Sequence, residues 1–275
     1  MTPPHPEITP AACAETLQTF RDTGPLVQSL TNTVVTNWTA NVLLAAGAAP
    51  AMVDNPHEAA EFAAVAGGVL VNLGTPQVET IAAMEEAVRG ASAAGTPWVL
   101  DPVAAGGLSW RTEVGRRLLS LHEPPAIVRG NASEILGLAG GAGGRGVDST
   151  DTAETALDAA HALACEHGTV VAVSGEVDHI TDGTRLVRVH NGHVLLTRVT
   201  GVGCSLGALM AGVAAVTDDR VLAATTATAL LTIAAEAAAT ESRGPGSFAV
   251  ALLDQLALIT PEGLESRLRI DGGTA

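Results

Sequence analysis

A continuous apolar run, Gly68-Val-Leu-Val-Asn-Leu73, is typical of a β-strand that is covered on both faces of its sheet. A helix pattern follows from Pro76 to Ala94, and a second apolar run, Pro97-Trp-Val-Leu-Asp101, predicts the next strand. Strand–helix–strand units of this kind join parallel strands through right-handed crossovers. This part of the chain therefore predicts the centre of a parallel sheet with helices on both faces.

The same alternation extends outward in both directions, from Pro25 to about Val173. Further strands are expected at Pro25–Leu30, Ala49–Val53, Ala126–Arg129 and Thr169–Val173, and further helices at Val34–Ala46 and Pro56–Ala66. No interior linker or charge block suggests a second domain. The sequence predicts one three-layer α/β domain over residues 25–275, preceded by an N-terminal segment with a helix at 1–24.

The pattern changes after Val173. Asp182-Gly183 and Asn191-Gly192 lie between short apolar runs, which predicts antiparallel hairpins at one edge of the sheet and a last strand at His193–Thr197. From Gly203 onward the chain reads as almost all helix. The glycine-rich stretch Gly140–Gly146 is expected to be a surface loop rather than a phosphate cradle, because it follows a helix and not a strand.

The composition excludes several functions. All 14 basic residues are arginines, so chemistries that need a lysine, such as a pyridoxal-phosphate Schiff base or a Walker A motif, are excluded. The net charge of −15 and the aromatic content of 2% argue against nucleic-acid binding. The most apolar stretch, Val221–Ala235, is shorter than the roughly 20 residues of a membrane span. Three scattered cysteines and no signal-peptide pattern favour the cytoplasm.

The segment Arg198-Val-Thr-Gly-Val-Gly-Cys-Ser-Leu-Gly207 predicts the end of a strand, a glycine turn and the start of an apolar helix. Gly201 and Gly203 let backbone N–H groups converge at the helix N-terminus, where the helix dipole favours an anion such as a phosphate. Cys204 lies where that dipole lowers the pKa of a thiol. An ordinary strand–helix turn explains the same glycine spacing, so this pattern alone leaves both interpretations open.

Polar residues also follow two other predicted strands. Arg129, Asn131 and Glu134 come at the end of the strand Ala126–Arg129, and Asp101 ends the strand before it. Open α/β sheets bind ligands at the carboxyl ends of their strands, and two carboxylates there can hold Mg²⁺ through water and phosphate oxygens. Asn131 and Glu134 fit a helix capping box as well, and an aspartate before proline also fits a simple turn.

Six segments, taken in their order along the chain, carry a family resemblance. They are Leu30-Thr-Asn-Thr-Val-Val-Thr-Asn-Trp-Thr-Ala-Asn41, Gly47-Ala-Ala-Pro-Ala-Met-Val53, Asp101-Pro-Val103, Arg129-Gly-Asn-Ala-Ser-Glu134, Ala172-Val-Ser-Gly-Glu176 and Thr200-Gly-Val-Gly-Cys204. Together they resemble the hydroxyethylthiazole kinases of thiamine biosynthesis, within the ribokinase-like superfamily. The set spans about Pro25 to Gly207 and is far more specific than any one segment.

The resemblance implies a ribokinase-like fold with a mostly parallel central sheet, an antiparallel hairpin edge and an all-helical C-terminal part. It also implies ATP-dependent phosphorylation of the primary alcohol of 4-methyl-5-(2-hydroxyethyl)thiazole, with Mg²⁺. The assembly that the family resemblance implies is a homotrimer with active sites between subunits. No nucleic acid and no membrane are expected as partners.

The resemblance also implies roles for single residues. Thiazole contacts would come from Met52, Asn32 and the backbone at Gly201, ATP contacts from Arg129, Ser174 and Asn131, magnesium-side carboxylates from Asp101 and Glu134, and contacts to the transferred phosphoryl group from Gly201, Gly203 and Cys204. Many relatives in the superfamily carry an aspartate base where this chain has Cys204, and the cysteine agrees with the thiazole-kinase subgroup. The position of Cys204 therefore raises the question of whether this chain has a strong general base.

Two alternatives remain open at this point. One is a related kinase of the same fold that acts on a hydroxymethylpyrimidine or another small alcohol, and the segment around Met52 favours the thiazole over it. The other is a protein that binds the thiazole or a nucleotide without catalysis. The joint presence of Asp101, Arg129, Glu134 and the glycine turn before Cys204 favours an enzyme.

Overall fold

The computed structural model describes residues 7–140 and 152–274, and most of the predicted loop at Gly140–Gly146 lies outside them. The described residues form one nine-stranded sheet in the order β2-β1-β3-β4-β5-β6-β7-β8-β9. Its strands are β1 (Leu26–Leu30), β2 (Ala49–Ala51), β3 (Gly68–Asn72), β4 (Trp98–Asp101), β5 (Ile127–Asn131), β6 (Val170–Ser174), β7 (Asp178–Thr181), β8 (Arg185–Val189) and β9 (Ile270–Thr274). The pairs from β2 to β6 are parallel, and those from β6 to β9 are antiparallel.

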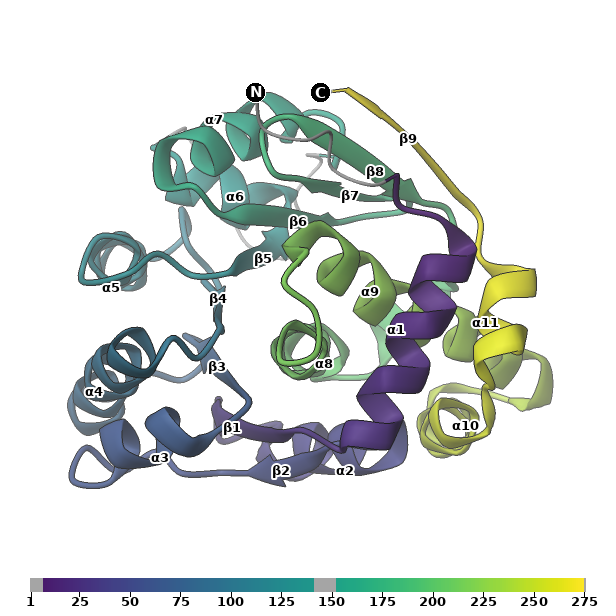
Figure 1. Cartoon of the computed structure of the whole chain (residues 1–275), viewed down its shortest axis with the longest axis horizontal. Coiled ribbons are helices and arrows are strands. Elements are labelled where there is room, and N and C mark those ends of the chain that lie inside the picture. The colour runs from purple at the N-terminus through teal and green to yellow at the C-terminus, as the bar shows by residue number, and fades with distance from the viewer. Residues whose placement is uncertain (1–6, 141–151, 275) are drawn as a thin grey trace.

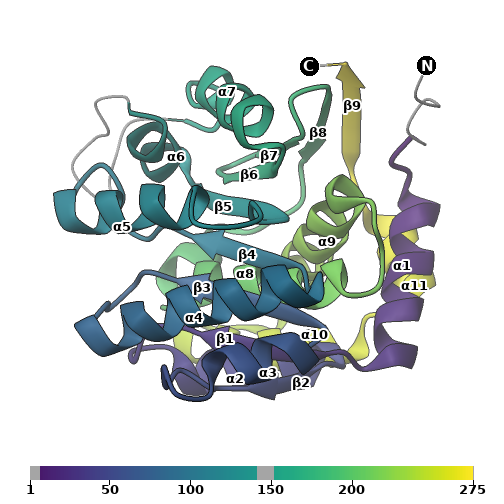
Figure 2. The same ribbon diagram turned by 60° about the vertical axis from the view of Figure 1, so that its left-hand side comes forward.

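Helices cover both faces of this sheet, as Figures 1 and 2 show. One layer consists of α3 (Ala59–Val65), α4 (Val78–Ala94), α5 (Ser109–Leu119), α6 (Ala132–Leu138) and α7 (Leu157–His167). The other layer consists of α1 (Pro10–Thr23), α2 (Thr36–Ala46), α8 (Val202–Ala214), α9 (Arg220–Glu241), α10 (Pro245–Leu258) and α11 (Pro261–Arg267). The prediction of a three-layer α/β fold is confirmed.

The central strands have continuous apolar sequences because both of their faces are buried. On β3, Leu70 packs into the cluster formed with α8 and α9, whereas its neighbours Val69 and Val71 pack into the cluster formed with α4. All three side chains are fully buried. Alternate residues of a strand point to opposite faces, so a strand between two helical layers needs an apolar residue at every position.

The helix α9 (Arg220–Glu241) is the one helix among the described residues that is long and apolar enough to cross a membrane. In the fold, 83% of its most apolar window is buried inside the protein. The Asp219 side chain caps its N-terminus by accepting from the N–H groups of Val221 and Leu222. The prediction that this stretch is a buried core helix is confirmed.

The sequence prediction is wrong at Asn191-Gly192, which forms no hairpin. The Asn191 side chain is buried, accepts from the Arg269 N–H at 2.8 Å and donates to the Glu236 carboxylate on α9. The chain then continues into a 3₁₀ turn, η1 (Val194–Arg198), where a strand was expected. Contacts to distant residues therefore override a local turn signal.

The prediction of an all-helical C-terminal part is wrong at its last element. The strand β9 (Ile270–Thr274) pairs antiparallel with β8 (Arg185–Val189) and completes the sheet. Its sequence, Ile-Asp-Gly-Gly-Thr, has an aspartate and two glycines at its centre, and these residue types are depleted in strands. The open edge of β8 and the pairing of Asp271 with Arg188 and His190 hold β9 in place.

Candidate functional site

The carboxyl ends of the neighbouring strands β3, β4, β5 and β6 bring polar side chains together at one edge of the sheet. Asn72 ends β3 and pairs in register with Asp101, which ends β4. Arg129 lies on β5, and Ser174 ends β6. Parallel strands expose all their carboxyl ends at the same edge, where open α/β sheets bind ligands. This edge is the candidate active site.

Arg129 is the centre of this cluster and is 6% exposed. Its Nη2 donates to Ser174 Oγ at 2.7 Å, and its Nη1 lies 3.5 Å from Asp101 Oδ2. Burial alone would lower the pKa of Arg129, but the carboxylates of Asp101 and Glu134 outweigh it and raise that pKa. The Nε atom is buried without a partner among the described residues. Arg129 is therefore a fully charged group that has unused hydrogen-bonding capacity.

The N-terminus of α8 (Val202–Ala214) packs directly against the Arg129 guanidinium. A Cβ on Gly203 would lie 2.8 Å from Arg129 Nη1, and a Cβ on Gly201 would lie 2.6 Å from Val35 Cγ1. Gly201 also has a φ of +85°, which favours glycine. The first backbone N–H groups of a helix have no partner within the helix, and the dipole adds positive potential there. The Arg129 guanidinium and the α8 N-terminus thus direct positive potential at one point, which suits an anionic ligand.

Cys204 lies in the first turn of α8, where its thiol faces Asn32. The Asn32 Nδ2 donates to Cys204 Sγ at 3.3 Å. Burial raises the pKa of the Cys204 thiol to about 11, and the negative charge of Asp101 acts in the same direction. The helix dipole expected from the sequence acts to lower the pKa of this thiol, but burial is the larger effect and raises it. The thiol stays protonated at neutral pH.

Asp101 has one carboxylate oxygen in use and one free. Its Oδ2 accepts from Asn72 Nδ2 at 2.7 Å, whereas its Oδ1 is buried without a partner among the described residues. Burial raises the pKa of Asp101, while the charge of Arg129 acts against that rise. A buried carboxylate oxygen without a partner is a suitable ligand for Mg²⁺.

Asn131 and Glu134 form the capping box of α6 (Ala132–Leu138). Asn131 Oδ1 accepts from the Glu134 N–H, and Glu134 Oε2 accepts from the Asn131 N–H, both at 2.9 Å. Glu134 Oε1 also accepts from the Ala104 N–H at 3.0 Å. The capping interpretation is confirmed, and the ATP role of Asn131 and the metal role of Glu134 stay predictions. Glu134 does lie close enough to raise the pKa of both Arg129 and Asp101.

Met52 lies at the edge of the sheet, since β2 is the edge strand and β1 separates it from β3. It directly follows β2 (Ala49–Ala51) and is half-buried. The segment after it is anchored by Gln28, whose Nε2 donates to the backbone oxygens of Val53 at 2.9 Å and Ala59 at 3.2 Å. The predicted contact of Met52 with a thiazole therefore stays a prediction.

The sequence interpretation missed two residues of the cluster. Asn72 donates to Asp101 and accepts from Asn32 Nδ2 at 3.1 Å, and it could have been found as the polar residue within an apolar strand. Asp178 at the start of β7 accepts from the Gly175 N–H at 2.9 Å, and burial raises its pKa to about 6 while Arg129 opposes that rise. No local pattern marks Asp178, because the fold alone brings it to Arg129.

The described residues contain no group of three or more histidine, cysteine or acidic side chains that could hold a metal ion. Mg²⁺ differs from zinc in this respect, because it is often bound by one or two carboxylates together with water and substrate phosphates. Asp101, with its unpartnered oxygen and with Glu134 close by, fits such a phosphate-borne Mg²⁺.

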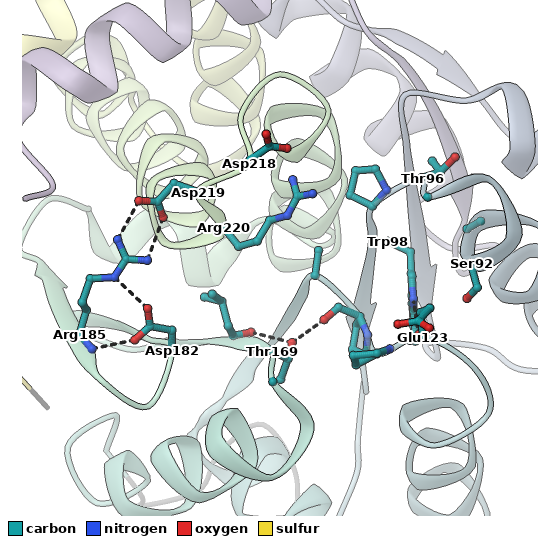
Figure 3. Close-up of a pocket in the computed structure, with 18 of the residues that line it drawn as sticks. Ser92, Thr96, Trp98, Glu123, Thr169, Asp182, Arg185, Asp218, Asp219 and Arg220 are labelled. Carbon is teal, nitrogen blue, oxygen red and sulfur yellow. Dashed lines mark hydrogen bonds and ion pairs between the residues drawn. The ribbon is translucent and has the colours of Figure 1, made fainter. Parts of the chain in front are cut away.

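A cavity of about 800 Å³ lies at the opposite edge of the sheet, where the strands begin (Figure 3). Residues just before or at the starts of β4, β5 and β6 line it, together with the loop before α9. Its Arg185 is fully engaged: Nε donates to Asp182 at 2.8 Å, and Nη1 and Nη2 donate to Asp219 at 2.7 and 3.0 Å. The convergent polar groups of the candidate site all lie at the other edge.

Comparisons with known proteins agree with this geometry. The sequence model of the hydroxyethylthiazole kinase family matches residues 17–262. The hydroxyethylthiazole kinase of Clavibacter sepedonicus is 60% identical over 250 residues, which cover 90% of each protein. That of Kineococcus radiotolerans is 54% identical over 274 residues, which cover 99% of this chain and 98% of the relative.

Solved structures show the same fold. A hydroxyethylthiazole kinase protein from Pyrococcus horikoshii has a TM-score of 0.87 and 39% identity, and the match covers 95% of this chain and 98% of that one. A ribokinase-like superfamily protein from Enterococcus faecalis has a TM-score of 0.62 at 11% identity, covering 90% of this chain and 94% of that one. At that identity the second match supports the fold alone.

Proposed function

The chain belongs to the hydroxyethylthiazole kinase family, and we propose that it transfers a phosphoryl group from ATP to the hydroxyl of 4-methyl-5-(2-hydroxyethyl)thiazole, in thiamine biosynthesis or salvage. The observation that carries the proposal is the convergence of Arg129, Asp101 and the α8 N-terminus on one point, directly beside Asn32 and Cys204. A phosphoryl acceptor and a donor can meet there. We further propose that residues 25–275 form the kinase domain, with α1 packed on it, and that the protein is cytoplasmic.

On the ATP side, Arg129 binds the phosphates and Ser174 orients its guanidinium through the 2.7 Å hydrogen bond. Arginine is the only permanent cation available to a chain without lysine. The backbone N–H groups at Gly201–Cys204 hold the transferred phosphoryl group, with the helix dipole adding to their field. Positioning and electrostatics of this kind supply most of the rate in phosphoryl transfer. Asn131 is also proposed to contact ATP, and its capping-box hydrogen bond with the Glu134 N–H holds its side chain in place.

Asp101 and Glu134 are the residues that would hold Mg²⁺ on this edge of the sheet. When bound, the ion neutralises negative charge on the phosphate oxygens. Asp101 offers its unpartnered Oδ1, and Glu134 is kept in place by two backbone N–H groups. Asn72 holds the other oxygen of Asp101.

On the thiazole side, Asn32 and the backbone at Gly201 border the space in front of Cys204, and Met52 is proposed to close it. Asn32 donates to Cys204 Sγ, which fixes both groups beside the acceptor hydroxyl. The Val35 and Trp38 side chains cover Gly201 and give this half an apolar wall. An apolar wall with a few placed polar groups is suited to a small heterocyclic alcohol.

The direct test is ATP consumption by the purified protein with hydroxyethylthiazole, compared with hydroxymethylpyrimidine. We expect turnover with the thiazole and a kcat/KM for the pyrimidine at least about tenfold lower, as a pocket shaped for one heterocycle gives. A preference for the pyrimidine would assign the chain to a related kinase. Tight thiazole or ATP binding without turnover would identify a non-catalytic binding protein.

We propose that the protein forms a homotrimer with active sites between subunits. Exposed apolar side chains support an interface over α10 and the two elements that it packs against, α2 and η1: Val34 just before α2, Leu44, Val194 and Val250. Val34 and Val194 also lie close in sequence to Asn32 and Gly201, so a second subunit on this face would border the site. Large apolar side chains that are exposed together mark interaction surfaces.

Light scattering should give a mass about three times the 27.6 kDa of one chain. Val194→Glu should shift this mass towards that of the monomer and lower activity, because it places a charge in an apolar interface. The matched control is Val78→Glu, a change at a similarly exposed valine on α4 in the opposite helical layer. This change should leave the mass and the activity unchanged. A monomeric wild type with full activity on dilution would contradict the trimer.

Cys204→Ala should lower kcat several-fold without abolishing activity, because Arg129 and the helix N–H groups still position the phosphoryl group. Since burial raises the pKa of this thiol to about 11, the loss should be constant from about pH 6 to 9. Cys204→Asp should keep or increase activity, because a carboxylate there can accept the proton of the hydroxyl.

The measurement is kcat against pH for both variants. Wild-type rates for Cys204→Ala over the whole range would show that the thiol has no catalytic part. An inactive Cys204→Asp that is folded and still binds ATP would show that Cys204 is not beside the acceptor hydroxyl.

A further inference from the structure

The strongest group not yet assigned a part in the reaction is Asn72, the last residue of β3. It is 1% exposed and lies in the middle of the candidate site, between Asn32 after β1 and Asp101 on β4. Its side-chain oxygen accepts two hydrogen bonds, from the Gly74 N–H at 3.0 Å and from Asn32 Nδ2 at 3.1 Å. Its side-chain nitrogen donates to Asp101 Oδ2 at 2.7 Å.

The backbone fixes the orientation of this carboxamide. The Gly74 N–H can only donate, so the atom of Asn72 that faces it must be the oxygen. The NH₂ group is then directed at Asp101 and donates to its carboxylate, which is an acceptor. Asn32 must likewise present its NH₂ group, which it shares between Asn72 and Cys204 Sγ. One backbone N–H thus determines the orientation of two buried amides.

Asn72 joins the two halves of the site. Through Asn32 it is connected to Cys204 on the acceptor side, and through Asp101 to Arg129 on the phosphate side. Gly74 completes the arrangement, because a Cβ at that position would overlap the Asn32 carboxamide. The Asn72 side chain is hydrogen-bonded to both halves, through its oxygen to Asn32 and through its nitrogen to Asp101.

We propose that Asn72 is a positioning residue that sets the distance between the acceptor hydroxyl and the transferred phosphoryl group, by holding Asn32 and Asp101 at a fixed separation. The proposal rests on the kinase function proposed above and assigns a residue to it. In-line transfer is sensitive to that distance, since a displacement of about 1 Å costs about 10²-fold in rate. In this proposal Asn72 acts through Asn32 and Asp101 and is a positioning residue.

The main test is Asn72→Ala, for which we expect kcat to fall about 10- to 100-fold while the KM for ATP and for the thiazole changes less than about threefold. Asn72→Asp has the same size and keeps the acceptor for Gly74 and Asn32, but it puts an oxygen against Asp101. We expect its kcat to fall by more than about tenfold as well. Wild-type kcat in either variant would overturn the proposal.

Asn191→Ala is the matched control for the loss of a buried asparagine. Asn191 is 2% exposed, accepts from a backbone N–H and donates to a carboxylate, as Asn72 does, but it lies at the base of β9. Asn191→Ala should lower the melting temperature and leave kcat unchanged. If both variants lose stability equally and kcat falls equally, the role of Asn72 is structural and the proposal fails.

Coupling gives a second readout. If Asn72 acts through Asn32, then Asn72→Ala and Asn32→Ala together should lower kcat little more than the larger single effect. Additive effects would show that the two residues act independently. The side-chain amide signals of Asn32 in NMR, assigned by their loss in Asn32→Ala, should shift in Asn72→Ala and stay near their wild-type position in Asn72→Asp.

This NMR readout separates the two proposals. A wild-type protein without thiazole kinase activity would refute the function, whereas unmoved Asn32 signals in Asn72→Ala would refute the positioning of Asn32 whatever the substrate is.

Discussion

Arg129→Ala should reduce kcat/KM for ATP by about 10²- to 10³-fold, the largest loss expected for any cationic residue of this protein. The side chain is the buried cation at the point where the strand ends and α8 meet, and its Nε is still available to a ligand. The chain has no lysine that could replace it. At least a several-fold increase in the KM for ATP should be part of the loss. Initial rates over a range of ATP concentrations measure kcat/KM and the KM for ATP.

The same substitution should also destabilise the fold. Asp101 and Glu134 would lose their common cation, and removing one partner of a buried ion pair costs about 3–5 kcal/mol. Arg129→Lys is the control that keeps the charge and loses the planar fork of donors. It should be closer to wild type in thermal unfolding, with an intermediate KM for ATP. An unchanged KM for ATP in Arg129→Ala would remove Arg129 from the site.

Asp101→Asn should reduce kcat by about 10²- to 10³-fold and lower the melting temperature less than Arg129→Ala does, because Glu134 still faces the Arg129 charge. The carboxamide has nearly the shape of the carboxylate and can still accept from Asn72, so packing is retained. The loss arises because the buried Oδ1, which has no partner, would no longer be available as an anionic ligand for Mg²⁺. Kinetic and Mg²⁺-titration measurements should show that the variant needs more Mg²⁺ for half-maximal rate.

Glu134→Gln separates the metal role from the capping role. It keeps one acceptor of the capping box but weakens the contacts with the Ala104 and Asn131 N–H groups. We expect a lower melting temperature and a smaller loss of activity than for Asp101→Asn. If Asp101→Asn is fully active at low Mg²⁺, then Asp101 is not on the metal side.

The parallel half of the fold could be predicted from the sequence because its physical cause is local. A strand between two helical layers is apolar at every position, so Pro97–Asp101 was expected as a strand and Trp98–Asp101 forms one. The clustering of Asp101 and Arg129 followed from the same rule, since parallel strands end at one edge. Asn72 obeys this rule equally, and its signal was a polar residue within an apolar run.

The other half depends on contacts that no local pattern shows. Asn191-Gly192 has the residues of a hairpin turn, yet Asn191 is buried against Glu236 and Arg269, and the turn does not form. Asp178 reaches Arg129 only because β7 folds back along β6. The high pKa of Cys204 arises from burial by several elements, whereas the sequence shows only its place at a helix start.

The pairing of β8 with β9 can form only late in the synthesis of the chain. Val189 and Ile270 are adjacent in the sheet, although roughly 80 residues separate them, and translation adds about 5–20 residues per second. The outer edge of β8 therefore stays open for about 4–16 s on the ribosome after it has been made. An open edge can pair with another nascent chain, and charged side chains on it discourage such pairing. Arg185 and Arg188 on β8 would thus protect the chain during the interval before β9 exists.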